Sequence, residues 1–129
     1  MPRPVHFEIH ADDPARAIKF YQTLFGWEFT EWVGPRTYWL IRTGGSETLG
    51  IDGGLVPREG PPPVEGAALN AYSCVIDVQS ADETAALITR LGGRVVVEKT
   101  PVVGIGWLAY AKDTEGNIFG FMQNDPTAI

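Results

Sequence analysis

The sequence predicts an α+β protein made of two copies of one βαβββ unit. A strand-like run at residues 5–10 leads into a helical stretch that ends with LFGW at residues 24–27. A second strand-like run at residues 71–78 leads into a helical stretch that ends with LGG at residues 91–93. The copies lie roughly 65 residues apart, a period that marks a duplicated structural unit. Paired units of this kind tend to enclose a ligand cleft, so the side chains facing that cleft decide the chemistry.

The size and charge of the chain limit the class of protein. Its 129 residues, 44% hydrophobic and 20% charged, are expected to form one globular domain over residues 1–129. The net charge of -6 argues against a nucleic-acid partner, because binding to phosphates requires a basic surface. We find neither the ~20 apolar residues of a membrane span nor the apolar run of a signal peptide. The single cysteine, Cys74, fits a reducing compartment and lies in an apolar run that indicates burial. We therefore expect a cytoplasmic protein that binds no membrane.

The first module is expected to span about residues 4–56. A strand comes first, and Asp13 then caps a helix whose first position is Pro14, where the missing N–H has no cost. Apolar residues recur at helical spacing until Gly26, which ends the helix. The strands are predicted at residues 4–10, 27–32, 38–43 and 48–56.

A proline-rich segment separates the modules. Residues 57–68 include three consecutive prolines, which cannot pair inside a sheet because proline lacks the backbone donor. We interpret this segment as a linker. The second module is expected over about residues 69–124, with a capping box at Ser80-Ala81-Asp82-Glu83 that starts its helix. Its strands are predicted at residues 70–78, 94–99, 106–112 and 117–124.

Several short motifs lie along the chain in a fixed order. They are HFEI at residues 6–9, DDPARA at 12–17, FY at 20–21, LFGW at 24–27, LGG at 91–93 and DTEGNI at 113–118. Their order and spacing resemble the vicinal oxygen chelate superfamily, which includes glyoxalases, bleomycin-resistance proteins and extradiol dioxygenases. The resemblance, nearest to the small glyoxalase-like proteins, implies two βαβββ modules whose curled mixed sheet surrounds a ligand cleft. It also implies a homodimer.

The resemblance further implies four strand positions that supply ligands in metal-dependent relatives. In this sequence they fall on His6, on Gly53 or Gly54, on Asn70 or Tyr72, and on Gly120. Of these, His6 alone is a good ligand for zinc, nickel or iron, and such sites need three or more His or carboxylate donors. We therefore predict that the protein binds no metal and no other cofactor.

His6, Glu8 and His10 share one face of the predicted first strand. The two imidazoles are roughly 13 Å apart along it, too far to hold one ion, although His6, Glu8 and Asp52 could form a makeshift metal site. Without a metal, His6 and Glu8 are the candidate catalytic acid and base, particularly if burial raises the carboxyl pKa. The structural alternative is that His6 forms a hydrogen bond across the sheet and that Glu8 meets an arginine.

Aromatic side chains offer a second kind of site. The chain has four tryptophans and four tyrosines, and Trp39 and Trp107 fall on matching third strands of the two modules. We expect both to line the cleft together with Tyr72, Asn70 and Gly120. Aromatic walls bind planar or cationic organic molecules by stacking and cation–π contact. The alternative is that these rings are buried in the core or in a dimer interface.

Three functions remain open from the sequence. The first is a metal-free module that binds a small organic molecule in an aromatic-lined cleft. The second is an atypical lyase, isomerase or dioxygenase-related enzyme that uses a degenerate metal site or His6 and Glu8 as acid and base. The third is a structural domain with a vestigial cleft. The missing metal donors favour the first, because the usual chemistry of the superfamily depends on the ion as electrophile.

Overall fold

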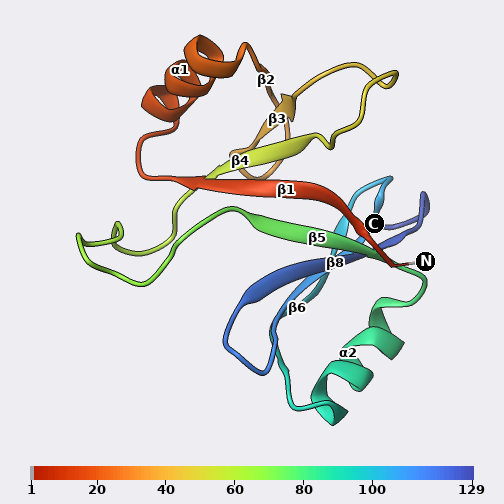
Figure 1. The fold of residues 1–129 in the computed structure, drawn as a ribbon. Helices are drawn as coiled ribbons and strands as arrows, with labels where there is room; N and C mark the ends of the chain where they lie inside the picture. The colour runs from red at the N-terminus through yellow and green to blue at the C-terminus, as the bar shows by residue number, and fades with distance from the viewer. Residues whose placement is uncertain (1) are drawn as a thin grey trace. The chain divides into compact units, whose positions relative to one another are not determined.

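The computed structural model describes residues 2–129, which form two compact units. The first unit comprises His6–Tyr72, and the second joins the N-terminal residues up to Val5 to Ser73–Ile129. Along the chain, one strand, one helix and three strands occur twice in succession (Figure 1). The predicted α+β class with two βαβββ modules is confirmed.

The first unit builds a mixed sheet from four strands. They are β1 (Pro4–Ala11), β2 (Glu28–Glu31), β3 (Trp39–Arg42) and β4 (Gly53–Pro57). The strand order is β2-β3-β4-β1, in which β1 and β4 are parallel and the other two pairs are antiparallel. Figure 1 shows β1 and β4 running side by side. The first and last strands of the module are therefore neighbours in the sheet.

Helix α1 (Pro14–Phe25) begins and ends where local chemistry requires it. The Asp13 carboxylate accepts a hydrogen bond from the backbone N–H of Arg16 at 3.2 Å, which satisfies a donor that the first turn leaves free. Gly26 ends the helix with a φ of 72°, a left-handed conformation that glycine adopts without steric cost. One side of α1 packs on the buried core of this unit, which consists of Phe7, Ile9, Ala11, Ile41 and Leu55.

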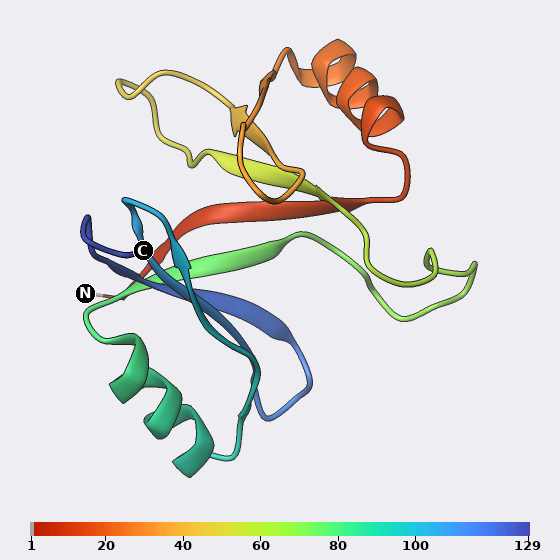
Figure 2. The same cartoon turned by 180° about the vertical axis from the view of Figure 1, so that it is seen from behind.

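The second unit repeats this plan with longer strands. They are β5 (Ser73–Val78), β6 (Arg94–Val102), β7 (Gly106–Lys112) and β8 (Ile118–Asn124). The order is β5-β8-β7-β6, and β5 and β8 are the parallel pair (Figure 2). Both modules thus close in the same way, with the first and last strands adjacent and parallel.

Helix α2 (Ala81–Arg90) starts at the predicted capping box. The Ser80 hydroxyl accepts a hydrogen bond from the Glu83 N–H at 3.1 Å. The helix packs on a buried core of Ala81, Ala109, Ala111 and Phe121. In the part of the chain that the structure describes, neither helix has the length and apolar character to span a bilayer.

One strand boundary differs from the prediction. The strand predicted at residues 48–56 begins only at Gly53, and residues 43–52 form a loop. Thr43 accounts for this loop, because its hydroxyl donates to the Ile51 carbonyl at 2.7 Å and its N–H donates to the Asp52 carboxylate at 2.9 Å. Side-chain bonds of this kind compete with the hydrogen bonds of a strand ladder. The following residues 58–72 contain no helix or strand.

The burial predicted for Cys74 is wrong. The cysteine lies on β5, where the apolar sequence indicated a buried side chain, but it is exposed. Val78, at the far end of β5, packs against the core beneath α2, whereas Cys74 is not among the residues that pack there. An apolar strand sequence alone therefore does not show how far the covering helix reaches.

Candidate functional site

The sheet of the first unit has two chemically different faces. Side chains alternate along β1, so Phe7 enters the core beneath α1 while His6 and Glu8 lie on the opposite face. Glu8 is 5% exposed, and so deep a burial is unusual for a carboxylate. Its register partner on β4 is Gly54. We call the surface formed by His6, Glu8, Gly54 and Tyr38 the His6 face.

Tyr38 extends across this face to His6. The two side chains form a hydrogen bond, with 2.8 Å between the Tyr38 hydroxyl oxygen and His6 Nε2. The tyrosine lies over Gly54, because a Cβ added to that glycine would overlap the hydroxyl and the ring carbon that bears it. The absence of a side chain at residue 54 therefore makes room for the His6–Tyr38 bond. This arrangement is the hydrogen bond across the sheet that the sequence analysis left open for His6.

Burial determines the protonation states of this pair. Burial lowers the pKa of His6 below its ordinary value of 6.5, and the negative charges of Glu8 and Asp52 oppose that effect. Burial also raises the pKa of Tyr38, and the charge of Glu8 adds to the increase. At neutral pH the pair is therefore an uncharged imidazole and an intact phenol. Such a pair can donate and accept hydrogen bonds and relay a proton.

Asp52, the third member of the makeshift metal site, is engaged by the loop at residues 43–52. Its Oδ1 accepts hydrogen bonds from the N–H of Thr43 at 2.9 Å and from the hydroxyl of Thr43 at 3.3 Å. Within residues 2–129, no three His, Cys, Asp or Glu side chains lie close enough together to hold a metal ion. The donor set of this face therefore does not fit a transition metal, which needs at least three such ligands.

The second unit has an equivalent face with different chemistry. Gly120 on β8 is the register partner of both Val75 and Tyr110. A Cβ added to Gly120 would lie 3.0 Å from Cε2 of Tyr110, so a tyrosine also lies against this glycine. Ser73 lies two residues before Val75, the β5 partner of Gly120. In the first unit His6 likewise lies two residues before Glu8, the β1 partner of Gly54. The strand register therefore aligns Ser73 with His6.

Asn70 and Tyr72 lie before β5 and do not occupy this position. The Asn70 side chain donates to the Ala68 carbonyl at 3.4 Å. The Tyr72 hydroxyl donates to the Tyr21 hydroxyl at 2.5 Å, and its ring stacks on Phe7 with 5.8 Å between centroids. Burial, together with the bond to Tyr21, raises the pKa of Tyr72 to about 12. Tyr72 thus belongs to the α1 side of the first unit, and Ser73 replaces both residues at the aligned strand position.

The two tryptophans expected in the cleft pack on the helix sides of their sheets. Trp39 packs against the core beneath α1, and Trp107 packs against the core beneath α2. The indole N–H of Trp107 donates to the Asp125 carboxylate at 3.0 Å, and Lys99 Nζ lies 5.0 Å from the centre of that ring. In the described chain, the aromatic side chain on the His6 face is instead Tyr38, one residue before Trp39. Strand alternation accounts for the difference, because a shift of one residue moves a side chain to the other face.

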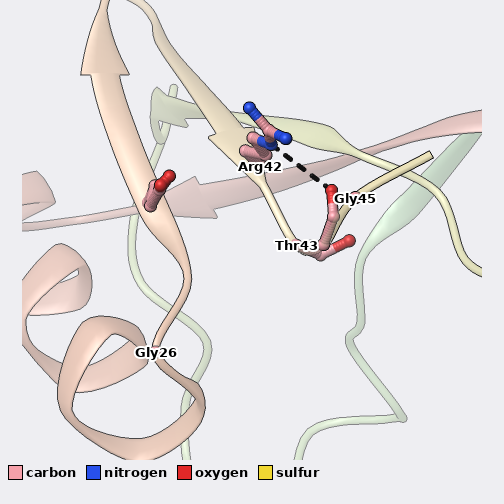
Figure 3. Close-up of a pocket in the computed structure, with 6 residues that line it drawn as sticks. Gly26, Arg42, Thr43 and Gly45 are labelled. Atoms are coloured by element: carbon pink, nitrogen blue, oxygen red, sulfur yellow. Dashed lines mark hydrogen bonds between the residues drawn. The ribbon is translucent and has the colours of Figure 1, made fainter. Parts of the chain in front are cut away.

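Two hollows of the first unit lie at the loop formed by residues 43–52. One, of about 360 Å³, lies beside Gly26 and Arg42 (Figure 3). A second, of about 400 Å³, extends along the loop to Asp52. Arg42 contacts the loop through a hydrogen bond that its Nε donates to the Gly44 carbonyl at 3.4 Å. Part of this segment was predicted as a strand, so these hollows were not expected from the sequence.

The chain is similar in sequence to one protein family and to two mycobacterial proteins. Residues 3–44 match the family model described as bleomycin resistance protein-like N-terminal. The CFP32 proteins of Mycobacterium bovis and Mycobacterium tuberculosis, provisionally named glyoxylases, are 28% identical over 121 residues. The matched region is 92% of this chain and 43% of theirs, so the chain spans less than half the length of these relatives.

Solved structures share the fold over nearly the whole chain. The methylmalonyl-CoA epimerase of Mycobacterium tuberculosis matches with a TM-score of 0.64 at 16% identity, over 95% of this chain and 88% of that one. The epimerase of Streptomyces coelicolor gives 0.62 at 18% identity, over 98% and 97%. These matches support the resemblance of the chain to the vicinal oxygen chelate superfamily in sequence and in fold. At these identities the structural matches establish the superfamily fold and not an activity.

The two units can be compared at two matching strand positions on the faces turned away from their helices. The strand register gives His6 and Gly54 in the first unit the same places that Ser73 and Gly120 have in the second. Two of the four are glycines, and each has a tyrosine against it. In the first unit that tyrosine forms a hydrogen bond with His6, the one residue of the four whose side chain is a good metal ligand.

Tyr38 and Ser73 are the site residues that the sequence analysis missed. A signal for Tyr38 was present, because two adjacent glycines, Gly53 and Gly54, within a strand mark a close approach by another group. The signal did not say which side chain approaches. Ser73 gave no comparable signal, since a serine in an apolar strand has no distinctive spacing.

Proposed function

We propose that this protein is a metal-free module that binds a small organic molecule at the His6 face. The observation that carries the proposal is the Tyr38 hydroxyl, which lies over Gly54 and is hydrogen-bonded to His6. It takes the space next to the histidine in which a metal-dependent relative would need a ligand side chain. His6 Nε2 is then engaged by a phenol.

The chemistry of the face indicates what kind of ligand it suits. The uncharged His6–Tyr38 pair offers hydrogen bonds, and the ring of Tyr38 offers an aromatic surface. Glu8 adds a carboxyl group that is almost wholly removed from solvent. Planar organic molecules with a polar substituent match such a surface, because stacking and one or two directed hydrogen bonds usually fix orientation in small-molecule sites.

Two measurements on one preparation test the proposal. Elemental analysis of protein purified without chelator is expected to find no stoichiometric zinc, nickel, iron or manganese. Calorimetric titration with two planar probes of opposite charge, naphthoate and naphthylmethylammonium, is expected to show one-to-one binding of at least one of them. His6→Ala should weaken that binding about 3–10-fold, the loss of one hydrogen bond. His10→Ala is the matched control, because His10 lies on an exposed part of the same strand.

The competing enzyme function gives the opposite result. One metal atom per chain that is lost in His6→Ala would favour a lyase, isomerase or dioxygenase-related enzyme with a degenerate metal site. Turnover of a bound compound without metal, abolished by both His6→Ala and Glu8→Gln, would favour acid–base catalysis by these residues. Absence of binding by either probe would contradict the proposed module.

We also propose a homodimer, as the resemblance implies. Three apolar side chains on α1 support it, because Phe20 and Leu24 are each 57% exposed and Phe25 is 56% exposed. Exposed apolar clusters of this kind commonly mark association surfaces. Light scattering should give twice the chain mass, and Phe20→Ser combined with Phe25→Ser should shift the protein toward the monomer. A monomeric wild type would contradict this proposal.

A further inference from the structure

Ser73 has a buried hydroxyl that no other group satisfies. The residue is 9% exposed, and its Oγ finds no hydrogen-bond partner in the described part of the chain. Buried hydroxyl groups are nearly always hydrogen-bonded, because an unpaired one loses its bonds to water without replacement. An orphaned group in a native structure therefore calls for an explanation, and a bound molecule is one that the geometry supports.

The place of Ser73 in the sheet points to a ligand position. It stands on β5 two residues before Val75, on the face of the second unit that is turned away from the α2 core. The corresponding residue of the first unit is His6, which stands on the face proposed to bind a ligand. Two equivalent positions thus carry polar side chains directed away from the helix-side cores, one hydrogen-bonded within the chain and one without a partner.

The neighbours of Ser73 define the chemistry that this face would recognise. Lys112 on β7 pairs with Ile118 on β8. Ile118 lies two residues before Gly120, and Gly120 pairs with Val75 on β5. Extending that register puts Ser73 and Lys112 in one row, about 10 Å apart across two strand spacings. The described residues place no carboxylate in an ion pair with Lys112. A hydroxyl donor and a free ammonium group in one row suit an oxygen acceptor that carries negative charge.

We infer that the Ser73 hydroxyl is a ligand contact of the second unit and donates a hydrogen bond to a carboxylate oxygen of a small organic anion. Lys112 supplies the positive charge at the other end of the row. The inference deepens the proposed function and rests on it in one respect, namely that the protein binds a small organic molecule.

The stability of Ser73→Ala tests whether the hydroxyl has a partner inside the protein. If it has none, removal of the buried oxygen should raise the thermal unfolding midpoint of the ligand-free protein by about 3 °C. Ser46→Ala, at an exposed serine in the loop at residues 43–52, should leave the midpoint unchanged. A lower midpoint for Ser73→Ala would show a satisfied hydroxyl and overturn the inference.

Calorimetric titration of the same variants with the two naphthyl probes tests the ligand contact. Ser73→Ala should weaken naphthoate binding about 3–10-fold and change naphthylmethylammonium binding less than about 2-fold. Ser46→Ala should affect neither probe. Equal weakening of both probes by Ser73→Ala, or no weakening of naphthoate, overturns the inference.

The His6→Ala variant separates failure of this inference from failure of the proposed function. Weakening by His6→Ala without weakening by Ser73→Ala overturns the Ser73 contact and leaves the proposed function in place. Weakening by Ser73→Ala alone supports the contact and removes the ligand from the His6 face. If the wild-type protein binds neither probe, both proposals are overturned.

Discussion

The two units fill the same helix-side position in opposite ways. In the first unit β1 contributes the large Phe7 opposite Gly53 of β4, and a Cβ added to that glycine would lie 2.6 Å from the phenylalanine ring. In the second unit β5 contributes the small Cys74, and by register the large Phe119 stands on β8. The bulk has moved from the first strand to the last. One backbone plan therefore accepts either assignment, as long as the paired positions together fill the space.

On the face turned away from the helix, both units have a glycine at the same strand position, but the side chains around that glycine differ. Gly54 and Gly120 each lie beneath a tyrosine, but Glu8 in the first unit is replaced by Val75 in the second. Ser73 likewise stands where the first unit has His6. At these two positions the first unit has the titratable side chains His6 and Glu8, and the second unit has Ser73 and Val75. The duplicated fold therefore holds the positions constant while the side chains at those positions differ.

The helix-side exchange predicts the largest difference in stability. Phe7 is 8% exposed and packs on Trp27 at 5.7 Å and Tyr72 at 5.8 Å between ring centroids. Phe7→Ala should lower the free energy of unfolding by about 3 kcal/mol, since it removes a buried ring and leaves a cavity. Cys74→Ala, at the equivalent exposed position, should change it by less than about 0.5 kcal/mol. Urea unfolding measures both, and similar losses would contradict the proposed exchange of bulk.

Alanine at the two covered glycines gives the next largest effect. Gly54→Ala should lower the free energy of unfolding by about 2–3 kcal/mol, because the added methyl group must displace Tyr38 from His6. Gly120→Ala should have a smaller effect of about 1 kcal/mol, since the nearest atoms are 3.0 Å away on Tyr110 and 3.1 Å away on Val75. Neither glycine has a positive φ, so backbone strain does not add to either value. Urea unfolding of both variants measures these losses and so compares how closely each tyrosine covers its glycine. A larger loss for Gly120→Ala than for Gly54→Ala would contradict the prediction.

The fold could be predicted from the sequence because its signals are local and repeated. The Asp13 and Ser80 caps and the stop at Gly26 act within one helical turn, so they are readable without knowledge of the partners. The start of β4 was not predictable in this way. It depends on the hydrogen bonds of Thr43 to groups eight and nine residues further along the chain.

The site was less predictable, because it depends on which side chains meet across strands. His6 and Glu8 were identified by alternation along one strand, and the structure places both on one face. Tyr38 was missed in favour of its neighbour Trp39, since the exact end of a short strand decides which of two adjacent aromatic residues faces the ligand side. Ser73 could be aligned with His6 only after the pairing of β5 with β8 was known.

Removal of the Tyr38 hydroxyl separates its hydrogen bond from the packing of its ring. Tyr38→Phe keeps the ring over Gly54 but leaves the His6 nitrogen without its partner, so the free energy of unfolding should fall by about 1 kcal/mol. Tyr72→Phe is the matched control in the same unit. Its hydroxyl also binds one partner, Tyr21, but the residue is 46% exposed and water can replace the bond. The free energy of unfolding of the control should therefore fall by less than about 0.5 kcal/mol. If urea unfolding shows a larger loss for Tyr72→Phe than for Tyr38→Phe, the hydroxyl that matters more for stability is that of Tyr72.

The smallest expected effect is a dependence of stability on pH, between about pH 7.5 and pH 5, that arises from His6 in the first unit. Burial lowers the pKa of His6 below 6.5, the value expected in the unfolded chain, and the charges of Glu8 and Asp52 only partly oppose this. The unfolded state therefore binds the proton more tightly than the folded state. Protonation of His6 does not change stability when both states are deprotonated, well above pH 6.5. Stability is lost as the pH falls through 6.5 toward the lower folded-state pKa.

Urea unfolding between about pH 7.5 and pH 5 measures this dependence. His6→Gln should flatten the decline on the acid side, because glutamine keeps a hydrogen-bonding group near Tyr38 but does not take up a proton. His10→Gln is the control on the same strand and should retain the decline. Ser73 occupies the equivalent place in the second unit and has no proton to gain, so Ser73→Ala should also leave the decline unchanged. A decline that persists in His6→Gln would assign the acid sensitivity to another group and remove this difference between the two units.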